Sequence, residues 1–349
     1  MPHDQASISQ HRIALGDHEM SYHAAGPENG PLVIFARGWP ELGYSWRHQL
    51  PTLAGLGFRA IAPDLRGHGD STLYPDFKDY SMEKHVGDLL ALLSKLGRER
   101  AVWVGHDWGA GVIWSLASHH PERCHAVANL CVPYGVLEHG LAGLVALVDR
   151  AVYPAAEYPA GQWDYQYFYE ENFERATTVF DANPAGAIKA LFRTDSRPGA
   201  RSTPAATATI RRDGGWFGGL EQAPDYPLDE SVISAADLDV YTAALKKTGF
   251  FGTDAFYMNH TANAAYAANS ANDGYLDMPV LFLTASYDYV CECVASKLPA
   301  PMRERCRNLT ERTVHSGHWM AQEKPLDVNN ALTHWLANSV PAAWPQPPL

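Results

Sequence analysis

The stretch Val102-Trp103-Val104-Gly105-His106-Asp107-Trp108-Gly109-Ala110-Gly111 decides the fold of this 349-residue chain. A short apolar run that begins at Ala101 predicts a buried parallel strand, and residues 112–117 predict a helix soon after it. The small residues between the two allow a sharp turn in which two backbone segments approach closely. Asp107 is the side chain that such a turn exposes, and a strand, turn and helix of this kind are typical of a nucleophile elbow.

An aspartate at the tip of this turn changes the chemistry that the turn supports. Most enzymes with this turn carry Ser there, whereas an unperturbed Asp has a pKa of about 3.9 and is already an anion at neutral pH. A carboxylate attacks an sp3 carbon without a base to activate it, and the resulting ester can be hydrolysed. Asp107 therefore indicates cleavage of a carbon–oxygen or carbon–halogen bond in the substrate. The alternative is an Asp that only caps the following helix.

Composition limits the partners that suit the chain. The formal net charge of −12 argues against nucleic acid and against an anionic membrane surface. The five cysteines are an odd number without zinc spacing, which is typical of free thiols in a reducing compartment. The N-terminal residues carry no secretory signal, and no apolar run approaches the roughly 20 residues of a membrane span. We therefore expect a cytoplasmic protein without a metal site, and the sequence leaves a homodimer open.

Strands alternate with helices early in the chain and again near its end. This rhythm predicts an α/β fold with a mostly parallel, doubly wound sheet. The rhythm breaks at Pro133, and residues 135–274 carry helical and aromatic patterns without a strong strand pattern. We therefore predict a core built from residues 1–134 and 275–349, with residues 135–274 inserted between them as a helical cap.

The boundaries of the expected elements follow from the hydrophobic patterns. The expected strands are 11–15, 19–23, 31–36, 58–63, 101–104, 125–132, 279–285 and 308–315. The expected helices are 45–56, 82–96, 112–119, 162–174, 184–192, 235–247, 254–268 and 326–339. The Gly- and Pro-rich residues 194–226 are expected to be irregular, and the Pro-rich tail 341–349 is expected to fray.

Reactive side chains follow several of the predicted strands. Ligands of an open α/β sheet bind beyond the carboxyl ends of its strands, where these loops meet. The chain order nucleophile, acid, histidine of the α/β-hydrolase triad is met by Asp107, Asp288 and His318. His315 is the competing base, but it falls within a strand pattern, so we favour His318. His106 is interpreted as a packed or hydrogen-bonded core residue. The backbone N–H groups of two further residues, Trp39 and Trp108, are suited to form an oxyanion hole.

At these residues the chain resembles the soluble epoxide hydrolases of the α/β-hydrolase superfamily. The resemblance rests on four motifs: residues 105–109, Asp64-Leu65-Arg66-Gly67-His68-Gly69-Asp70-Ser71, Thr284-Ala285-Ser286-Tyr287-Asp288-Tyr289, and Gly317-His318-Trp319. It implies the α/β-hydrolase fold with a cap, a small-molecule epoxide as substrate, and no metal or organic cofactor. It also implies an alkyl ester on Asp107 that His318, oriented by Asp288, hydrolyses to release a vicinal diol.

The cap carries the part of the resemblance that is specific to epoxides. Epoxide hydrolases use two cap tyrosines as hydrogen-bond donors to the epoxide oxygen, and the motif Trp163-Asp164-Tyr165-Gln166 supplies Tyr165. The motif Phe256-Tyr257-Met258-Asn259 supplies Tyr257. The neighbours Tyr167 and Tyr169 remain open on sequence alone. The tryptophans expected to contact the substrate are Trp39, Trp108, Trp163 and Trp319.

One residue departs from the family pattern. The family has His-Gly-X-Pro in the oxyanion loop, whereas this chain has Arg37-Gly38-Trp39-Pro40. Arg37 cannot both donate and accept as a neutral imidazole does, which leaves open a substrate with an anionic group. The rival hypotheses are a haloalkane dehalogenase, which shares the Asp nucleophile and triad, and a catalytically weak binding protein of the same fold. A halide-release assay beside a diol assay separates the first rival from an epoxide hydrolase.

Overall fold

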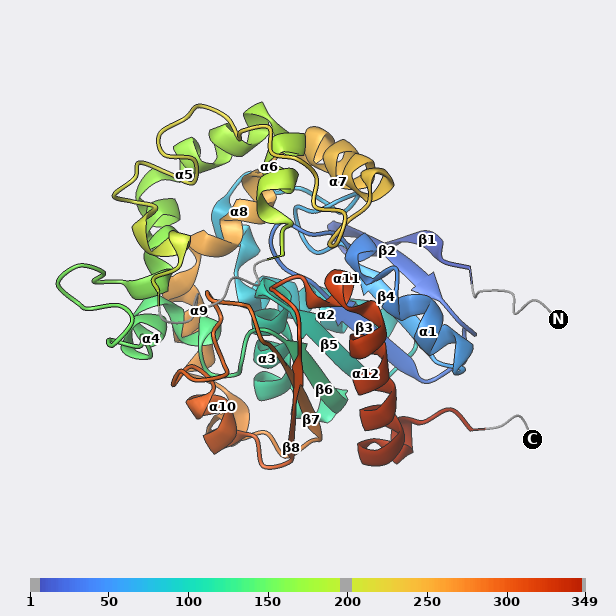
Figure 1. Ribbon diagram of the computed structural model, residues 1–349. Helices are drawn as coiled ribbons and strands as arrows, with labels where there is room; N and C mark the ends of the chain where they lie inside the picture. The colour runs from blue at the N-terminus through green and yellow to red at the C-terminus, as the bar shows by residue number, and fades with distance from the viewer. Residues whose placement is uncertain (1–6, 195–202, 347–349) are drawn as a thin grey trace.

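The computed structural model describes residues 7–194 and 203–346, and an eight-stranded sheet runs through its centre (Figure 1). The strands are β1 (Ser9–Leu15), β2 (His18–Ala25), β3 (Leu32–Ala36), β4 (Arg59–Pro63), β5 (Ala101–His106), β6 (Cys124–Leu130), β7 (Val280–Ala285) and β8 (Leu309–Val314). Their order is β1-β2-β4-β3-β5-β6-β7-β8. Strand β2 pairs antiparallel with β1 and β4, and all other pairs are parallel. The predicted mostly parallel α/β sheet is confirmed.

Helices cover both faces of this sheet, which explains why its central strands are apolar throughout. Every residue of β3, β5 and β7 is buried. Along β3, Val33 and Phe35 point into one hydrophobic layer with α1 (Gln49–Gly55) and α12 (Pro325–Ser339). Ile34 and Ala36 point into the other layer, with the helices α2 (Met82–Lys95) and α3 (Trp108–His119). The alternation of the pleat thus divides one apolar strand between two cores.

The chain between β6 and β7 forms the helical part of the molecule. Its helices are α4 (Gly140–Ala146), α5 (Asp164–Ala182), α6 (Pro184–Leu191), α7 (Ala235–Thr248), α8 (Phe251–Asp254) and α9 (His260–Ala267). In Figure 1, α5, α6 and α7 lie above the sheet, and α8 lies between them and the sheet. The remaining helices, α10 (Ala300–Arg305) and α11 (Met320–Glu323), follow β7 and β8. Residues 195–202 of the segment that we expect to be irregular lie outside the described residues.

Two expected helices are interrupted. The helix expected over 254–268 is split into α8, a 3-10 helix η8 (Ala255–Met258) and α9, because Asn259 leaves the helical conformation and its side chain donates to the carbonyl of Phe77 at 2.7 Å. The helix expected over 45–56 begins only at Gln49, after the 3-10 turn Gly43–Trp46. Pro51 explains this break, since a proline in a helix interior removes a hydrogen bond.

The C-terminal tail is ordered further than expected. Residues Pro341–Ala343 form a 3-10 turn, and the ring of Trp344 packs edge-on against Phe58 at a centroid distance of 5.5 Å. The expectation of fraying is therefore wrong for these residues, and residues 347–349 lie outside the described part of the chain. Trp344 buries apolar surface against Phe58, and this burial holds the tail in place although its prolines favour irregular structure.

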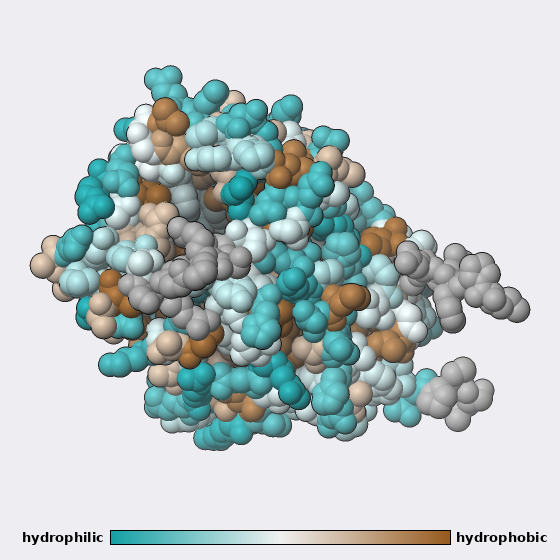
Figure 2. Space-filling model, in the orientation of Figure 1, coloured by the Kyte–Doolittle hydropathy of each residue, from teal (hydrophilic) through white to brown (hydrophobic). Residues whose placement is uncertain are grey.

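The face of the molecule shown in Figure 2 is mostly hydrophilic, with apolar residues scattered singly or in small groups. Such scatter is usual for a protein surface. None of the helices in residues 7–194 and 203–346 combines the length and the apolar character that crossing a bilayer requires.

Candidate active site

A strained turn joins β5 to α3 and carries Asp107 at its tip. Asp107 has φ 52° and ψ −129°, a conformation that L-residues rarely adopt. A Cβ on Gly105 would lie 2.2 Å from Oδ1 of Asn129, and a Cβ on Gly109 would lie 2.6 Å from the backbone of Ala36. Glycine is therefore required at both positions for the helix to pack this close to the sheet. The strain exposes the carboxylate of Asp107 at the carboxyl edge of the sheet.

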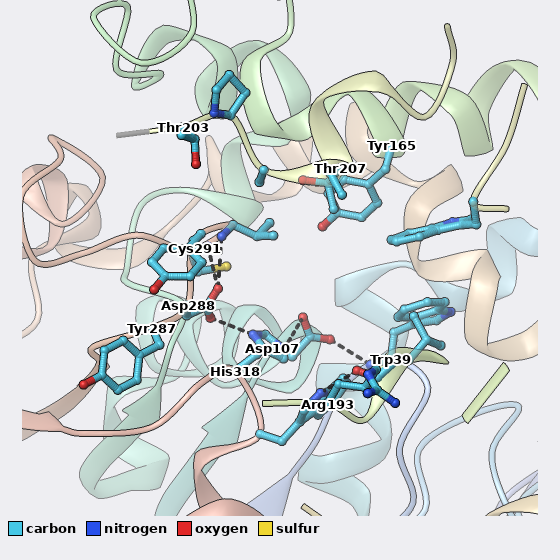
Figure 3. A pocket seen from close by; sticks show the side chains of 18 of the residues that line it. Trp39, Asp107, Tyr165, Arg193, Thr203, Thr207, Tyr287, Asp288, Cys291 and His318 are labelled. Atoms are coloured by element: carbon cyan, nitrogen blue, oxygen red, sulfur yellow. Dashed lines mark hydrogen bonds and ion pairs between the residues drawn. The ribbon is translucent and has the colours of Figure 1, made fainter. Parts of the chain in front are cut away.

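Three of the predicted residues meet at this edge. Nδ1 of His318 lies 2.7 Å from Oδ2 of Asp288, and Nε2 of the same ring lies 3.6 Å from Oδ2 of Asp107 (Figure 3). The backbone N–H groups of Val290 and Cys291 donate to Oδ1 of Asp288 at 3.2 and 2.9 Å. These bonds hold Asp288 in one orientation, so that its other oxygen fixes the imidazole between the two carboxylates.

The two other candidate histidines do not take this place. His315 is exposed, and its Nδ1 lies 3.0 Å from Oγ of Ser286. His106 is buried, with Nδ1 2.8 Å from Glu41 and Nε2 2.9 Å from the carbonyl oxygen of His318. His106 is therefore a hydrogen-bonded core residue, as its position predicts, and it ties Glu41 to the loop that carries His318.

The charges around His318 set its protonation. Burial disfavours the imidazolium, but the carboxylates of Asp288 and Asp107 outweigh burial and raise the pKa of His318 to about 9. Burial likewise disfavours the charged form of Asp288, but the nearby imidazolium of His318 outweighs it and lowers the pKa of this carboxyl. The raised pKa therefore favours the imidazolium form of His318 in the free site at neutral pH.

The loop after β3 supplies backbone donors beside the nucleophile. The N–H of Trp39 donates to Oδ1 of Asp107 at 2.8 Å. A Cβ on Gly38 would lie 2.1 Å from this oxygen and 2.3 Å from the backbone N of Trp108, so both amides lie close to the carboxylate. Oδ1 faces these amides while Oδ2 faces His318, which gives the two oxygens of Asp107 different surroundings.

Arg37 supports this loop from inside the protein. Its side chain is fully buried, and Nη1 donates to the carbonyl oxygen of Gly38 at 2.6 Å. Burial lowers the pKa of Arg37, while the nearby acids Asp64 and Glu41 oppose that effect. Arg37 is not among the residues that line the cavity, so the structure gives it no contact with a bound anionic group.

A cavity of about 250 Å3 lies over Asp107 between core and cap. Tyr165 of α5 and Tyr257 of η8 line it from the cap side, and Figure 3 shows Tyr165 across the cavity from Asp107 and His318. Their rings are 5.6 Å apart. Burial raises the pKa of both phenols well above 10, so both hydroxyls stay neutral donors at physiological pH.

The structure separates these tyrosines from their neighbours. Tyr169 stacks on Tyr257 at 4.2 Å, and its hydroxyl accepts a hydrogen bond from the indole of Trp216 at 3.1 Å. Tyr167 packs beneath the guanidinium of Arg211. Tyr167 and Tyr169 do not line the cavity, so of these four tyrosines Tyr165 and Tyr257 are the two that share it with Asp107.

Two of the four expected tryptophan contacts line the cavity, namely Trp39 and Trp319. The ring of Trp108 stacks instead on Phe256 at 5.4 Å and meets the ring of Tyr257 edge-on at 5.2 Å. Trp163 is 1% exposed and packs in the hydrophobic core. The structure therefore places Trp108 and Trp163 outside the lining of the cavity.

Sequence reasoning missed Trp216. It lines the cavity, stacks on Trp39 at 5.6 Å and meets Tyr165 edge-on at 5.4 Å. The signal that was available is a lone pair of aromatics within Gly214-Gly215-Trp216-Phe217-Gly218-Gly219. Glycines on both sides let the backbone turn the indole back towards the site.

A buried carboxyl in the cap anchors the oxyanion loop. The indole N–H of Trp39 donates to Oδ1 of Asp254 at 2.6 Å, and the hydroxyl of Thr177 donates to Oδ2 at 3.1 Å. Burial raises the pKa of Asp254 well above its usual range, despite these two donors. The contact joins the core loop that carries an oxyanion donor to the cap that carries Tyr257.

The sheet order and the strained elbow, with Asp107 at its tip beside His318 and Asp288, are those of an α/β-hydrolase fold. The family model described as alpha/beta hydrolase fold matches residues 31–325, and the chain belongs to that family. Epoxide hydrolase A of Mycobacterium tuberculosis is 32% identical over 320 residues, which cover 89% of this chain and 92% of that protein. The chain belongs among the epoxide hydrolases of this fold.

Two further comparisons support this placement. Bifunctional epoxide hydrolase 2 of Sus scrofa is 31% identical over 334 residues and 95% of this chain, which spans only 56% of that longer protein. The crystal structure of epoxide hydrolase A from Mycobacterium thermoresistibile has a TM-score of 0.77 and 30% identity. That match covers 95% of this chain and 99% of the other, so the similarity includes the helical segment between β6 and β7 as well as the sheet.

Proposed function

We propose that the protein hydrolyses small-molecule epoxides to vicinal diols through a covalent ester on Asp107. The observation that carries the proposal is a carboxylate, in place of a hydroxyl, on the elbow beneath two neutral phenols and beside His318. A carboxylate suits attack on an epoxide carbon, and neutral phenols suit the alkoxide that this attack creates.

In the first step, Oδ2 of Asp107 attacks one carbon of the epoxide. Oδ1 is the oxygen held by the N–H of Trp39, so Oδ2 is the one that is free to become the ester oxygen. The carbon–oxygen bond of the epoxide breaks, the hydroxyls of Tyr165 and Tyr257 stabilise the developing alkoxide, and one of these phenols transfers its proton to it. The proton that the imidazolium of His318 loses before the second step returns to that phenol. The rest of the cavity wall, rich in aromatic rings, excludes water from the alkyl group.

In the second step, His318 activates water against the acyl carbon of Asp107. Ester formation removes the negative charge of Asp107, which is one of the causes that raise the pKa of His318. The imidazole therefore becomes easier to deprotonate once the ester exists, when a base is needed. Oδ1 becomes the tetrahedral oxyanion, and the amides of Trp39 and Trp108 stabilise it.

Haloalkane dehalogenation is the rival that the same nucleophile allows. Such a site needs free N–H donors for the halide, and the indoles around this cavity are already engaged. Trp39 donates to Asp254, Trp216 donates to Tyr169, and the indole N–H of Trp319 donates to the carbonyl of Leu191 at 2.8 Å. This engagement favours the epoxide over the halide.

A turnover screen tests the proposal. Styrene oxide, an aliphatic epoxide, an epoxy acid and a haloalkane are incubated with the full chain, and diol and halide are both measured. We expect diol from at least one epoxide, dependent on Asp107, and no halide. Halide release without diol would replace the proposal with dehalogenation.

A further inference from the structure

A thiol lies beside the proposed triad without a role in the reaction. Cys291 follows Asp288 by three residues and lines the cavity. Its backbone N–H holds Oδ1 of Asp288 at 2.9 Å, and Figure 3 shows its sulfur next to that carboxylate. Sγ of Cys291, one oxygen of Asp288 and one ring nitrogen of His318 all lie within 4.8 Å of one another. Three different donor atoms therefore converge at one end of the cavity.

This donor set suits a borderline or soft divalent cation. Sulfur, nitrogen and oxygen ligands with an open fourth position are typical of zinc, and thiolate favours softer ions. Ligand atoms about 2.0–2.3 Å from a tetrahedral ion lie roughly 3.3–3.7 Å apart. Side-chain shifts of about 1 Å would bring the present atoms to that spacing. The cavity supplies both the route of the ion and the open position.

A second group with similar atoms lacks these advantages. Sγ of Cys131, a ring nitrogen of His106 and one of His318 also lie within 4.8 Å of one another. However, both ring nitrogens of His106 are already hydrogen bonded, and Sγ of Cys131 donates to the carbonyl oxygen of His318 at 3.2 Å. Cys131 is 1% exposed and does not line the cavity. An ion arriving from solvent therefore meets Cys291 first.

We propose that Cys291, Asp288 and His318 form an inhibitory binding site for Zn2+ or Cd2+. The thiol proton and the proton shared by imidazole and Asp288 leave to solvent, and sulfur, nitrogen and oxygen bind the ion. The bound ion occupies the imidazole of His318 and the carboxylate of Asp288. Because the second step needs both groups, the ion blocks hydrolysis of the ester. The proposal that the ion binds rests on the positions of the three ligand atoms. The proposal that it inhibits the enzyme rests on the proposed function.

The test uses the full chain with CdCl2 and ZnCl2 in buffer free of thiols and chelators. Cys291→Ser keeps the size of the side chain, and Cys131→Ser and Cys306→Ser are matched variants at two other buried cysteines. Thermal melting first confirms that each variant is folded. Binding is measured by calorimetry and by the ultraviolet band of the cadmium–thiolate bond, and epoxide turnover is measured against the metal-free rate of each variant.

We expect one Cd2+ per chain in the parent, in Cys131→Ser and in Cys306→Ser, with the thiolate band and with inhibition over the same concentration range. Loss of an outer-shell partner weakens metal sites by roughly 10- to 100-fold, so loss of the ligand Cys291 should weaken binding by at least that factor and remove the band. Parent-like binding in Cys291→Ser, or loss of binding in Cys131→Ser, would overturn the proposal. If Cd2+ binds through Cys291 but no epoxide is turned over, the site stands and the proposed function fails.

Discussion

Mild acid should destabilise this protein through His260, a buried histidine at the start of α9. His260 is 3% exposed, neither ring nitrogen has a partner among the described residues, and its ring lies 5.7 Å from that of Trp108. Burial lowers the pKa of His260 from 6.5 to about 3. The unfolded chain therefore binds a proton between these values that the folded chain does not bind, so stability falls as pH falls below about 6.5.

The size of this effect follows from the two pKa values. Between pH 7 and pH 5, a histidine with a pKa of 6.5 unfolded and about 3 folded loses about 2 kcal/mol of stabilisation. His260→Phe removes the titration and keeps an aromatic ring, so the variant should lose about 2 kcal/mol less than the parent over this interval. His334→Gln, at an exposed histidine, should behave as the parent does.

Urea unfolding at pH 7 and pH 5 measures these differences in the free energy of unfolding. The comparison is the pH-dependent loss within each variant, so a constant effect of the substitution on stability cancels. If parent and His260→Phe lose the same free energy between the two pH values, the buried neutral imidazole is refuted as a cause of acid sensitivity.

The remaining predictions concern the site. His318→Gln should accumulate stoichiometric alkyl-enzyme in intact mass spectra, whereas His315→Gln should turn over normally; trapping by the His315 variant would mean that the base is misassigned. Tyr165→Phe and Tyr257→Phe should each slow alkylation in rapid-quench experiments by roughly 100-fold or less, and the double variant should be nearly inactive; parent rates in the double variant would make both tyrosines packing residues. Gly109→Ala should cost about 1–3 kcal/mol in urea unfolding and lower kcat, because its Cβ would lie 2.6 Å from the backbone of Ala36; an unchanged melting curve would contradict the close approach.

The sequence predicts the core of the fold well because the signals there are local. An apolar run before Gly105 and small residues after it indicate both the buried strand and the elbow, and the structure has both. Asp107, Asp288 and His318 each follow a predicted strand. Because parallel strands end at the same edge of a sheet, their meeting could also be predicted. Such features need no knowledge of distant contacts.

The cap could not be predicted to the same depth, because its contacts join distant residues. Trp39 and Asp254 are 215 positions apart, and nothing near either residue indicates their hydrogen bond. The break at Asn259, two residues after Tyr257, is accompanied by a hydrogen bond from its side chain to the carbonyl of the distant Phe77. Trp216 stacks on Trp39, 177 positions away, and its Gly-rich surroundings indicate a sharp turn but not this partner.

Arg37 shows how a residue type can mislead when its surroundings are unknown. A cation in the oxyanion loop suggests an anionic substrate on sequence alone. In the structure this side chain is fully buried and holds the Gly38 carbonyl, while burial lowers its pKa. Arg37 therefore supports the loop through its guanidinium in place of an imidazole, and the Trp39 amide still donates to Asp107.

The covalent ester on Asp107 is the central claim, and isotope labelling tests it most directly. The protein is allowed to turn over an epoxide in water enriched in heavy oxygen, and the first diol and the peptide that carries Asp107 are analysed by mass spectrometry. We predict that a single turnover with excess enzyme leaves the label in the Asp107 carboxylate and gives unlabelled diol, because the ester oxygen comes from the protein. Labelled diol in that first turnover, with an unlabelled Asp107 peptide, would mean that water attacks the epoxide directly and would contradict the mechanism.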